Sequence, residues 1–260
     1  MIDIGANLTH SKFAQNLDET ITSAIAAEVE KIIVTGTDIN SSKSALALCQ
    51  NYSCLYATAG THPHDASEFN QRSIEQLKLL LAHPKVVAVG ETGLDFNRNF
   101  SSPSAQIKAF TQQIELAIDC QKPLFLHERD AFDTQYQILK DVRSEINGAV
   151  VHCFTGSQYE LEQYLALDLY IGITGWICDE RRGLTLQKMV HIIPDDRLLI
   201  ETDAPFLTPR TLTGKAKRAS NTPSNLAHIA QAIGGFRRQP LSHVATVSRQ
   251  NSIRLFSLPI

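Results

Sequence analysis

Short apolar segments alternate with longer amphipathic segments along the whole chain. Between the short runs, apolar residues recur every three or four positions, as at 73–81, 104–120 and 131–145, and this spacing is typical of one helical face. A strand followed by a helix, repeated eight times, predicts an α/β fold, a single (β/α)8 TIM barrel with its helices outside. The eight predicted strands are 2–5, 31–36, 55–60, 86–90, 123–126, 149–151, 169–173 and 197–201.

The length and composition agree with this architecture. A chain of 260 residues has the usual size of a TIM barrel, so we expect one domain over residues 1–260. An open doubly wound sheet is the alternative, although no GxGxxG motif follows the first run. The net charge of -3 argues against a protein that coats nucleic acid with a broad basic surface. It is compatible with an enzyme that meets phosphate at a local metal site.

The cysteines and the amino terminus favour a reduced cytoplasmic setting. The five cysteines are scattered and form no CxxC pair, which argues against a disulfide framework and a structural zinc site. The first residues, MIDIGANLTH, lack the basic and apolar regions of a secretory signal, and no run reaches membrane-spanning length. We expect a cytoplasmic monomer with no membrane partner.

Four of the apolar runs stop at a residue that can bind a metal ion. The carboxyl ends of all strands in a parallel barrel meet on one face, so such residues can surround a single ion. Carboxylates suit Mg2+ or Mn2+, and imidazoles are common ligands of transition metals. An acid at the last of these runs can also accept a proton from an attacking water. The runs VVAVGE, PLFLH, AVVH and LLIETD end at Glu91, His127, His152 and Asp203.

Each of these residues also has a purely structural interpretation. Glu91 is as well explained by a helix cap or by an ion pair with Arg129, and a lone histidine is more often a hydrogen-bonded core residue. Asp203 precedes a proline by two positions, where an Asx turn would need the same residue. His62 and His64 follow the third run, where they can orient a substrate or only stabilise the loop.

Two further groups of residues could bind a substrate or could have only a structural role. Basic side chains in the irregular stretch 208–225 can contact phosphate beside the active face, or can be solvated surface. Aromatic residues near the ends of the runs can stack bases, or can belong to the core. The basic residues are Arg210, Lys215, Lys217 and Arg218, and the aromatic ones are Phe96, Phe100, Phe154 and Trp176.

Seven motifs resemble those of the TatD family of metal-dependent deoxyribonucleases, which are relatives of the amidohydrolase-type barrels. The motifs stand in one order and extend over nearly the whole chain, so the set is far more specific than any one of them. They are DIGANLT from Asp3, GTHPH from Gly60, GETGLDFNRN from Gly90, PLFLHERDA from Pro123, HCFTG from His152, GITGWICDERRG from Gly172 and IETDAPFLTPR from Ile200.

The resemblance implies a TIM barrel that binds one or two divalent ions, Mg2+ in the first place and otherwise Mn2+ or Zn2+. It implies a 3′–5′ exonuclease that acts on single-stranded DNA, with RNA as a second substrate, in DNA repair or nucleic-acid turnover. Among the matching residues, it implies that Asp203 is a metal ligand or the general base and that His62 is catalytic or contacts the substrate. The further metal ligands it implies are Glu91, His127 and His152, and Arg129 and Asn97 are weaker candidates.

The sequence departs from the wider family in two places. Many relatives have an HxH pair on the first strand that holds a second ion, whereas Gly5 and Asn7 stand here and offer no imidazole. In the late loop, Ser220-Asn221-Thr222-Pro223 replaces an RNEP sequence, so we predict no site residue there. The departure on the first strand weakens the expectation of a second ion.

Two other functions compete with a nuclease. The first is a metal-dependent amidohydrolase or lactonase acting on a small molecule, and the second is a catalytically silent barrel that serves as a binding partner. The missing HxH pair counts against the first, as does Glu91, which stands where such enzymes often have a bridging lysine. The intact set of four ligand types counts against the second.

Overall fold

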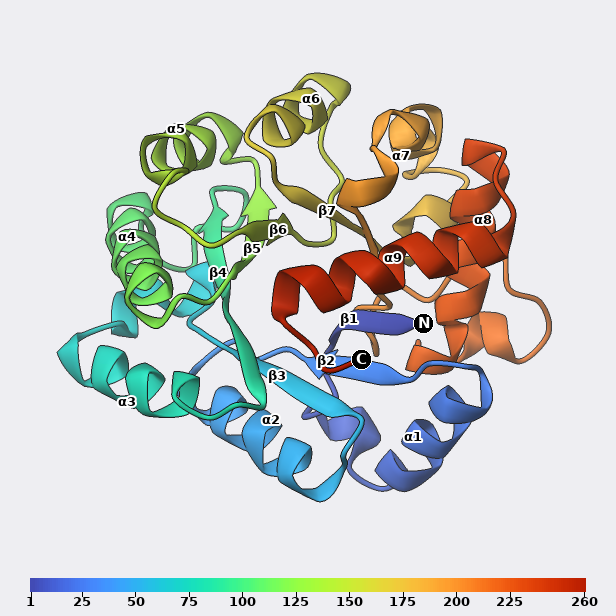
Figure 1. Cartoon of the computed structure of the whole chain (residues 1–260), viewed down its shortest axis with the longest axis horizontal. Helices are drawn as coiled ribbons and strands as arrows, with labels where there is room; N and C mark the ends of the chain where they lie inside the picture. The colour runs from blue at the N-terminus through green and yellow to red at the C-terminus, as the bar shows by residue number, and fades with distance from the viewer.

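The computed structural model describes residues 1–260 and contains one parallel sheet of eight strands. Each strand pairs with the next along the chain, and a bridge between Ala6 and Ala204 joins the last strand region to the first. The sheet is therefore curled into a barrel, with helices around its outside (Figure 1), which confirms the predicted TIM barrel. The strands are β1 (Ile2–Ala6), β2 (Lys31–Val34), β3 (Leu55–Ala59), β4 (Val86–Asp95), β5 (Leu124–Arg129), β6 (Ala149–Val151), β7 (Tyr170–Ile173) and β8 (Leu198–Ile200).

The helices follow the predicted amphipathic segments. Predicted helices at 73–81, 104–120 and 131–145 correspond to α3, α4 and α5, and α3 starts earlier because Asn70 caps its first turn. The α-helices are α1 (Leu17–Ala26), α2 (Ile39–Asn51), α3 (Gln71–Leu81), α4 (Pro103–Cys120), α5 (Phe132–Val142), α6 (Gln158–Ala166), α7 (Leu184–Met189), α8 (Leu226–Arg237) and α9 (Leu241–Phe256). The 3-10 helices are η1 (Ser11–Phe13), η2 (Pro63–Glu68), η3 (Gly175–Cys178), η4 (Val190–Ile192), η5 (Asp195–Arg197), η6 (Ala216–Arg218) and η7 (Pro223–Asn225).

Strands β4 and β5 are longer than their apolar runs predict. Their ladder shifts register between Val89 and Thr92 and then continues through the pair Gly93–His127 to the pair Asp95–Arg129. Polar residues extend these two strands because they lie at the mouth of the barrel, where other polar groups are available as partners. The prediction that β4 ends at Gly90 is wrong, and Glu91 lies inside the strand.

The core has two layers, and the inner one leaves only one end of the barrel open to a ligand. The outer layer lies between the sheet and the helices, and the inner layer fills the barrel. Leu255, Phe256 and Leu258 at the end of α9 pack into the inner layer with Ile2 and Ile4 of β1. In Figure 1, α9 crosses the barrel beside both chain termini. The amino-terminal end of the barrel is therefore covered, and the carboxyl ends of the strands remain for a site.

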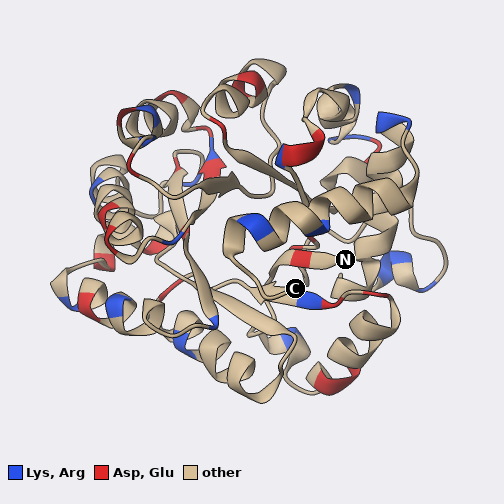
Figure 2. Cartoon of the chain, viewed as in Figure 1, with Lys and Arg blue, Asp and Glu red and all other residues tan.

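Charge is dispersed over the outer elements. Lys and Arg positions and Asp and Glu positions are both distributed along the outer helices, as the blue and red segments of Figure 2 show. None of the helices combines the length and the apolar character that crossing a membrane requires. A nucleic acid would therefore have to be recognised by local groups rather than by a basic face.

Close contact between β3 and β4 gives a test of the barrel geometry. A Cβ at Gly60 would lie 2.6 Å from the Cα of Gly90, which is backbone and cannot rotate away. We expect Gly60→Ala to lower the free energy of unfolding by about 1–3 kcal/mol through overpacking. Gly235→Ala is the control, since Gly235 has open space around it in α8, and this change should stabilise the protein by about 0.5–1 kcal/mol. Urea unfolding measures both free energies. If the two variants were equally stable, the close contact between Gly60 and Gly90 would be wrong.

Candidate active site

A cavity of about 450 Å³ opens at the carboxyl ends of the strands. This is the face on which TIM-barrel enzymes carry their active sites, and the volume is in the range of small-ligand sites. All the predicted metal ligands and catalytic residues line this one cavity. Its lining is Asn7, Thr37, His62, His64, Asp65, Glu91, His127, Glu128, Arg129, His152, Cys153, Trp176, Asp203, Phe206 and Leu207.

Three imidazoles surround one oxygen of Glu91. Its Oε1 lies 2.8 Å from Nε2 of His152, 3.0 Å from Nδ1 of His127 and 3.4 Å from Nε2 of His62. The carboxylate neither caps a helix nor pairs with Arg129, whose guanidinium donates to Thr155. Both structural interpretations of Glu91 are therefore wrong. Glu91, in β4, therefore contacts side chains from β5 and from the segments after β3 and β6.

The ionisation of these groups follows from their proximity. Burial favours the neutral form of Glu91, but the charges of His152 and His62 and the hydrogen bonds from His127 and His152 hold its pKa well below the usual value. Burial also opposes protonation of His152, yet Glu91 and Glu201 together raise its pKa well above that of a free imidazole. The site therefore holds a carboxylate balanced by positive imidazole, which is the charge balance that a bound cation would replace.

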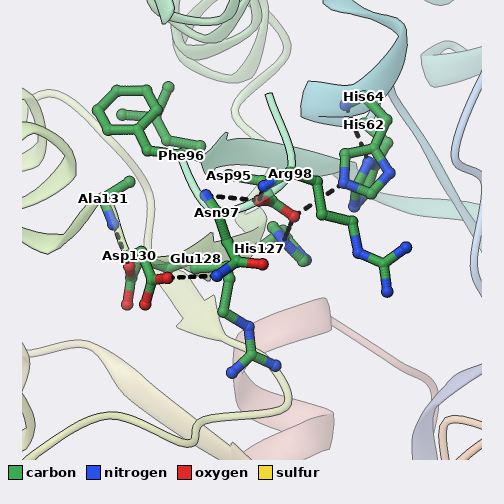
Figure 3. Close-up of polar contacts among 12 residues, drawn as sticks. His62, His64, Asp95, Phe96, Asn97, Arg98, His127, Glu128, Asp130 and Ala131 are labelled. Carbon is green, nitrogen blue, oxygen red and sulfur yellow. Dashed lines mark hydrogen bonds and ion pairs between the residues drawn. The ribbon is translucent and has the colours of Figure 1, made fainter. Parts of the chain in front are cut away.

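Asp95 is a second acidic anchor, at the end of β4. Its Oδ2 lies 2.8 Å from Nε2 of His64 and 3.3 Å from Nε2 of His127, as Figure 3 shows. Its Oδ1 accepts hydrogen bonds from the backbone N–H groups of Asn97 and Arg98. Asp95 was not singled out from the sequence. The two-residue period of a strand would have indicated it, because positions 91, 93 and 95 share a face.

Buried glutamines of α4 fix the segments that carry these side chains. The amide of Gln113 accepts from the backbone N–H of Thr61 and donates to its carbonyl, which holds the residue next to His62. Gln106 makes the same pair of bonds with the backbone of Asp95. Both glutamines are completely buried. The outer helix therefore positions the loop after β3 and the end of β4 through four directed hydrogen bonds.

Glu201 contacts the Nδ1 of His152, the ring nitrogen that does not face Glu91. Its Oε2 lies 3.3 Å from Nδ1 of His152, and its Oε1 accepts from the backbone N–H of Cys153 at 2.5 Å. The carboxylate occupies space that side chains would need at two glycines, since a Cβ at Gly5 would lie 2.5 Å from Oε2 and one at Gly172 would lie 2.8 Å from Oε1. No role was predicted for Glu201, although it stands two residues before Asp203. A carboxylate behind a histidine in this way sets the orientation of the ring.

Asp203 faces the cavity and is held by Asn7. The Asn7 side-chain amide donates to Asp203 Oδ1 at 2.9 Å, and this is the hydrogen bond that the carboxylate makes, so it forms no Asx turn. Asp203 has a positive φ of 55°, and its backbone N–H donates to the carbonyl of Gly5. Burial raises the pKa of Asp203 to about 7, against the opposing charge of His152. Asn7 supplies no imidazole, but it orients this carboxylate.

The two nitrogens of His62 have different partners. Its Nδ1 accepts a hydrogen bond from the backbone N–H of His64 at 3.1 Å, which begins η2. A neutral imidazole that accepts at Nδ1 carries its proton on Nε2. The Nε2 of His62 faces Glu91 and the cavity. His62 is therefore presented to the cavity as a hydrogen-bond donor.

The arrangement can hold a metal ion. Ligand atoms of His62, Glu91 and His127 lie within 4.8 Å of one another. Metal bonds to nitrogen and oxygen are about 2 Å long, so ligands of one ion lie about 3 Å apart, as these atoms do around Glu91. This compact group contains His62 where the sequence analysis expected His152. His152 lies outside this group of three, although its Nε2 is 2.8 Å from the same oxygen of Glu91.

The remaining predicted residues differ in their surroundings. Arg129 lines the cavity, whereas Asn97 is exposed and donates to Asp130 at 2.6 Å (Figure 3). Arg210 forms an exposed bidentate ion pair with Glu180. Phe154 is only 2% exposed and belongs to the core, so it is not available for stacking.

Comparison with known proteins relates the whole chain to one family. A family model described as TatD related DNase matches residues 2–257. The chain is 45% identical to the 3'-5' ssDNA/RNA exonuclease TatD of Escherichia coli strain K12 and 44% identical to the protein of the same name from Citrobacter koseri. Each match covers 99% of this chain and 99% of the relative.

Solved structures give the same relationship. A TatD homologue from Escherichia coli K12 has a TM-score of 0.90 and 32% identity, over 100% of this chain and 98% of that chain. A TatD family hydrolase from Entamoeba histolytica has a TM-score of 0.89 and 28% identity, over 98% of this chain and 97% of that chain. The similarity therefore extends over the full barrel.

The contact between Glu201 and His152 predicts a loss of metal affinity in Glu201→Gln. Glutamine can still accept from Cys153, but its amide nitrogen cannot accept from Nδ1 of His152, so the ring loses its orientation. We expect Mn2+ to bind about 10- to 100-fold more weakly, measured by isothermal titration calorimetry. Glu115→Gln, an exposed change on α4, is the control. Unchanged affinity in a folded Glu201→Gln protein would show that the contact does not position the ligand.

Proposed function

Since the chain belongs to the TatD-related DNase family, we propose that it is a metal-dependent 3′–5′ exonuclease that hydrolyses phosphodiester bonds of single-stranded DNA and RNA. The name and the 45% identity of the Escherichia coli relative support the substrate. The observation that carries the proposal is the convergence of three imidazoles on Glu91 inside the cavity.

We propose that Glu91, His127 and His152 hold one divalent ion, with Asp203 as a further ligand or as the base beside it. Mg2+ is the proposed ion because carboxylates contribute to the set, and the imidazoles make Mn2+ or Zn2+ the alternatives to test. When bound, the ion supplies a Lewis acid that polarises a phosphoryl oxygen and lowers the pKa of water. Glu201 supports this role of His152 by fixing its ring.

The proposed base is Asp203. One of its oxygens accepts from Asn7, which leaves the other to orient and deprotonate a water that attacks phosphorus. A pKa raised to about 7 by burial gives this carboxylate enough basicity to take up a proton near neutral pH. In this step the water oxygen bonds to phosphorus, the water proton passes to Asp203, the phosphoester bond to the leaving oxygen breaks, and solvent protonates that oxygen.

The proposed hydrogen-bond donor to the reacting group is His62. Its Nε2–H faces the cavity while its Nδ1 is held by the backbone N–H of His64. A donor in this position can stabilise charge on a phosphoryl oxygen or on the leaving oxygen. Gln113 supports the role, because it holds the backbone at Thr61 and therefore fixes the position of His62.

We also propose that the enzyme is a cytoplasmic monomer with one domain over residues 1–260. The cavity is complete within one chain, and its lining extends from Asn7 to Leu207. The five free cysteines support a reducing compartment. A role in DNA repair or in nucleic-acid turnover follows from the proposed chemistry.

End-labelled single-stranded DNA tests the proposed activity. We expect the purified protein with Mg2+ to produce a ladder that shortens by one nucleotide at a time from the 3′ end, and EDTA to abolish it. Parallel reactions with Mn2+ and Zn2+ identify the ion that gives the highest rate. Failure to cleave any nucleic acid, together with turnover of a lactone or amide, would favour the competing hydrolase function.

Two single variants separate metal binding from hydrogen-bond donation. Glu91→Ala should lose the divalent ion and the activity together, because it removes the oxygen on which the ligands converge. His62→Ala should keep metal affinity within a few-fold but lower kcat by about 10²- to 10³-fold, as removal of a hydrogen bond to developing charge does. Calorimetry with Mn2+ and single-turnover cleavage give the two quantities. If His62→Ala also lost the metal, His62 would be a ligand and not the donor.

A further inference from the structure

The apolar part of the cavity lining comes from one half of the strand order, whereas ionisable side chains come from both halves. His64 follows β3, Glu91 and His127 lie in β4 and β5, and His152 and Asp203 follow β6 and β8. The apolar side chains all follow β6, β7 or β8. These apolar residues are Cys153, Trp176, Phe206 and Leu207.

Phe206 is the exposed aromatic residue of this apolar wall. Nine large hydrophobic side chains are exposed on the molecule, and Phe206, at 49% exposure, is the one among them that lines the cavity. Its backbone N–H donates to the carbonyl of Asp203 at 2.9 Å, and its ring meets His10 edge to face at 5.5 Å. The phenyl ring is therefore fixed close to the proposed base while half of its surface stays open.

Trp176 in η3 carries a second aromatic ring of the cavity lining, and the guanidinium of Arg182 covers one of its faces. Its indole N–H donates to the carbonyl of Arg182, and the Arg182 guanidinium lies 4.3 Å from the ring centroid. The guanidinium of Arg129, also in the cavity lining, lies 5.8 Å from the same ring. A fixed aromatic ring beside cationic groups is the combination that binds single-stranded nucleic acid, because bases stack on the ring and phosphates meet the cations.

The geometry points to Phe206 and Trp176 as the base-stacking residues that select unpaired nucleotides at this site. The inference rests on the proposed exonuclease function and adds its specificity. A phosphodiester beside Glu91 would have its neighbouring bases in the same cavity, which Phe206 and Trp176 also line. Stacking reads neither the base identity nor the 2′-hydroxyl, so one wall serves DNA and RNA. A base in a duplex must leave its partner before it can enter the cavity.

Kinetics on matched oligonucleotides test the inference. One substrate ends in thymidine at its 3′ end, and the other ends in an abasic nucleotide. We expect the wild-type protein to show a KM roughly tenfold higher for the abasic end, from the usual strength of base–aromatic stacking. Phe206→Ala should raise KM for the thymidine end by a similar factor and reduce the discrimination, since Trp176 remains. Phe206→Tyr should restore both, whereas Phe206→Leu should not.

The control and a direct binding measurement complete the experiment. Phe236→Ala removes an exposed phenylalanine of α8 that is outside the cavity and should match wild type. Trp176 is the single tryptophan of the chain, so its fluorescence reports contact directly. The probe is an oligothymidylate with a phosphorothioate at the terminal linkage, which slows cleavage. We expect it to quench the tryptophan fluorescence, and the abasic analogue to quench this fluorescence less.

The possible outcomes separate this inference from the proposed function. Cleavage by wild type, with Phe206→Ala or Phe206→Leu indistinguishable from it in KM and in discrimination, would overturn the stacking role alone. If the oligothymidylate did not quench the fluorescence of Trp176, the proposed stacking on Trp176 would be wrong. A wild-type protein that cleaves neither oligonucleotide with any divalent ion would overturn the exonuclease function, and the stacking role with it.

Discussion

The burial of Glu91 is the constraint on which the rest of the site depends. A carboxylate that is 7% exposed at the mouth of an apolar barrel is costly unless positive charge and hydrogen bonds compensate it. Three imidazoles provide this compensation, and each comes from a different element. The same compensation explains why the arrangement suits a divalent ion, which can take the place of the protons on these rings. The imidazoles that stabilise the buried Glu91 carboxylate are therefore also the groups that could bind the ion.

The imidazoles keep their positions because a further set of buried polar groups holds them. Asp95 bridges His64 and His127, and Glu201 holds His152. Gln106 and Gln113 of α4 fix the backbone that carries these groups, through hydrogen bonds to Asp95 and Thr61. In a TIM barrel such contacts link the outer helices to the inner site, so a change in α4 can alter the geometry of the cavity without touching it.

The sequence allowed the fold to be predicted because each strand is a short apolar run bounded by a glycine or a polar residue. It did not reveal the full length of β4, since the residues after Gly90 are polar and their strand partners are distant in the chain. The four predicted ligands lie in one cavity, as convergence of the strand ends requires. Gln113 was not recognised, because a polar residue on an amphipathic helix is normally exposed, and only tertiary contact with Thr61 explains its burial. Glu201 was missed because its partners Cys153 and His152 are far away in sequence.

Gly5 shows how a local departure from the wider family is absorbed by this fold. Without a side chain at position 5, the Glu201 carboxylate can lie close to β1, and Asn7 turns to Asp203 instead of offering an imidazole. Position 5 therefore leaves room for the carboxylate that contacts His152, and position 7 orients Asp203. A larger residue at position 5 would clash with the buried carboxylate of Glu201, so a histidine could stand there only if Glu201 moved. The glycine and the glutamate therefore constrain one another.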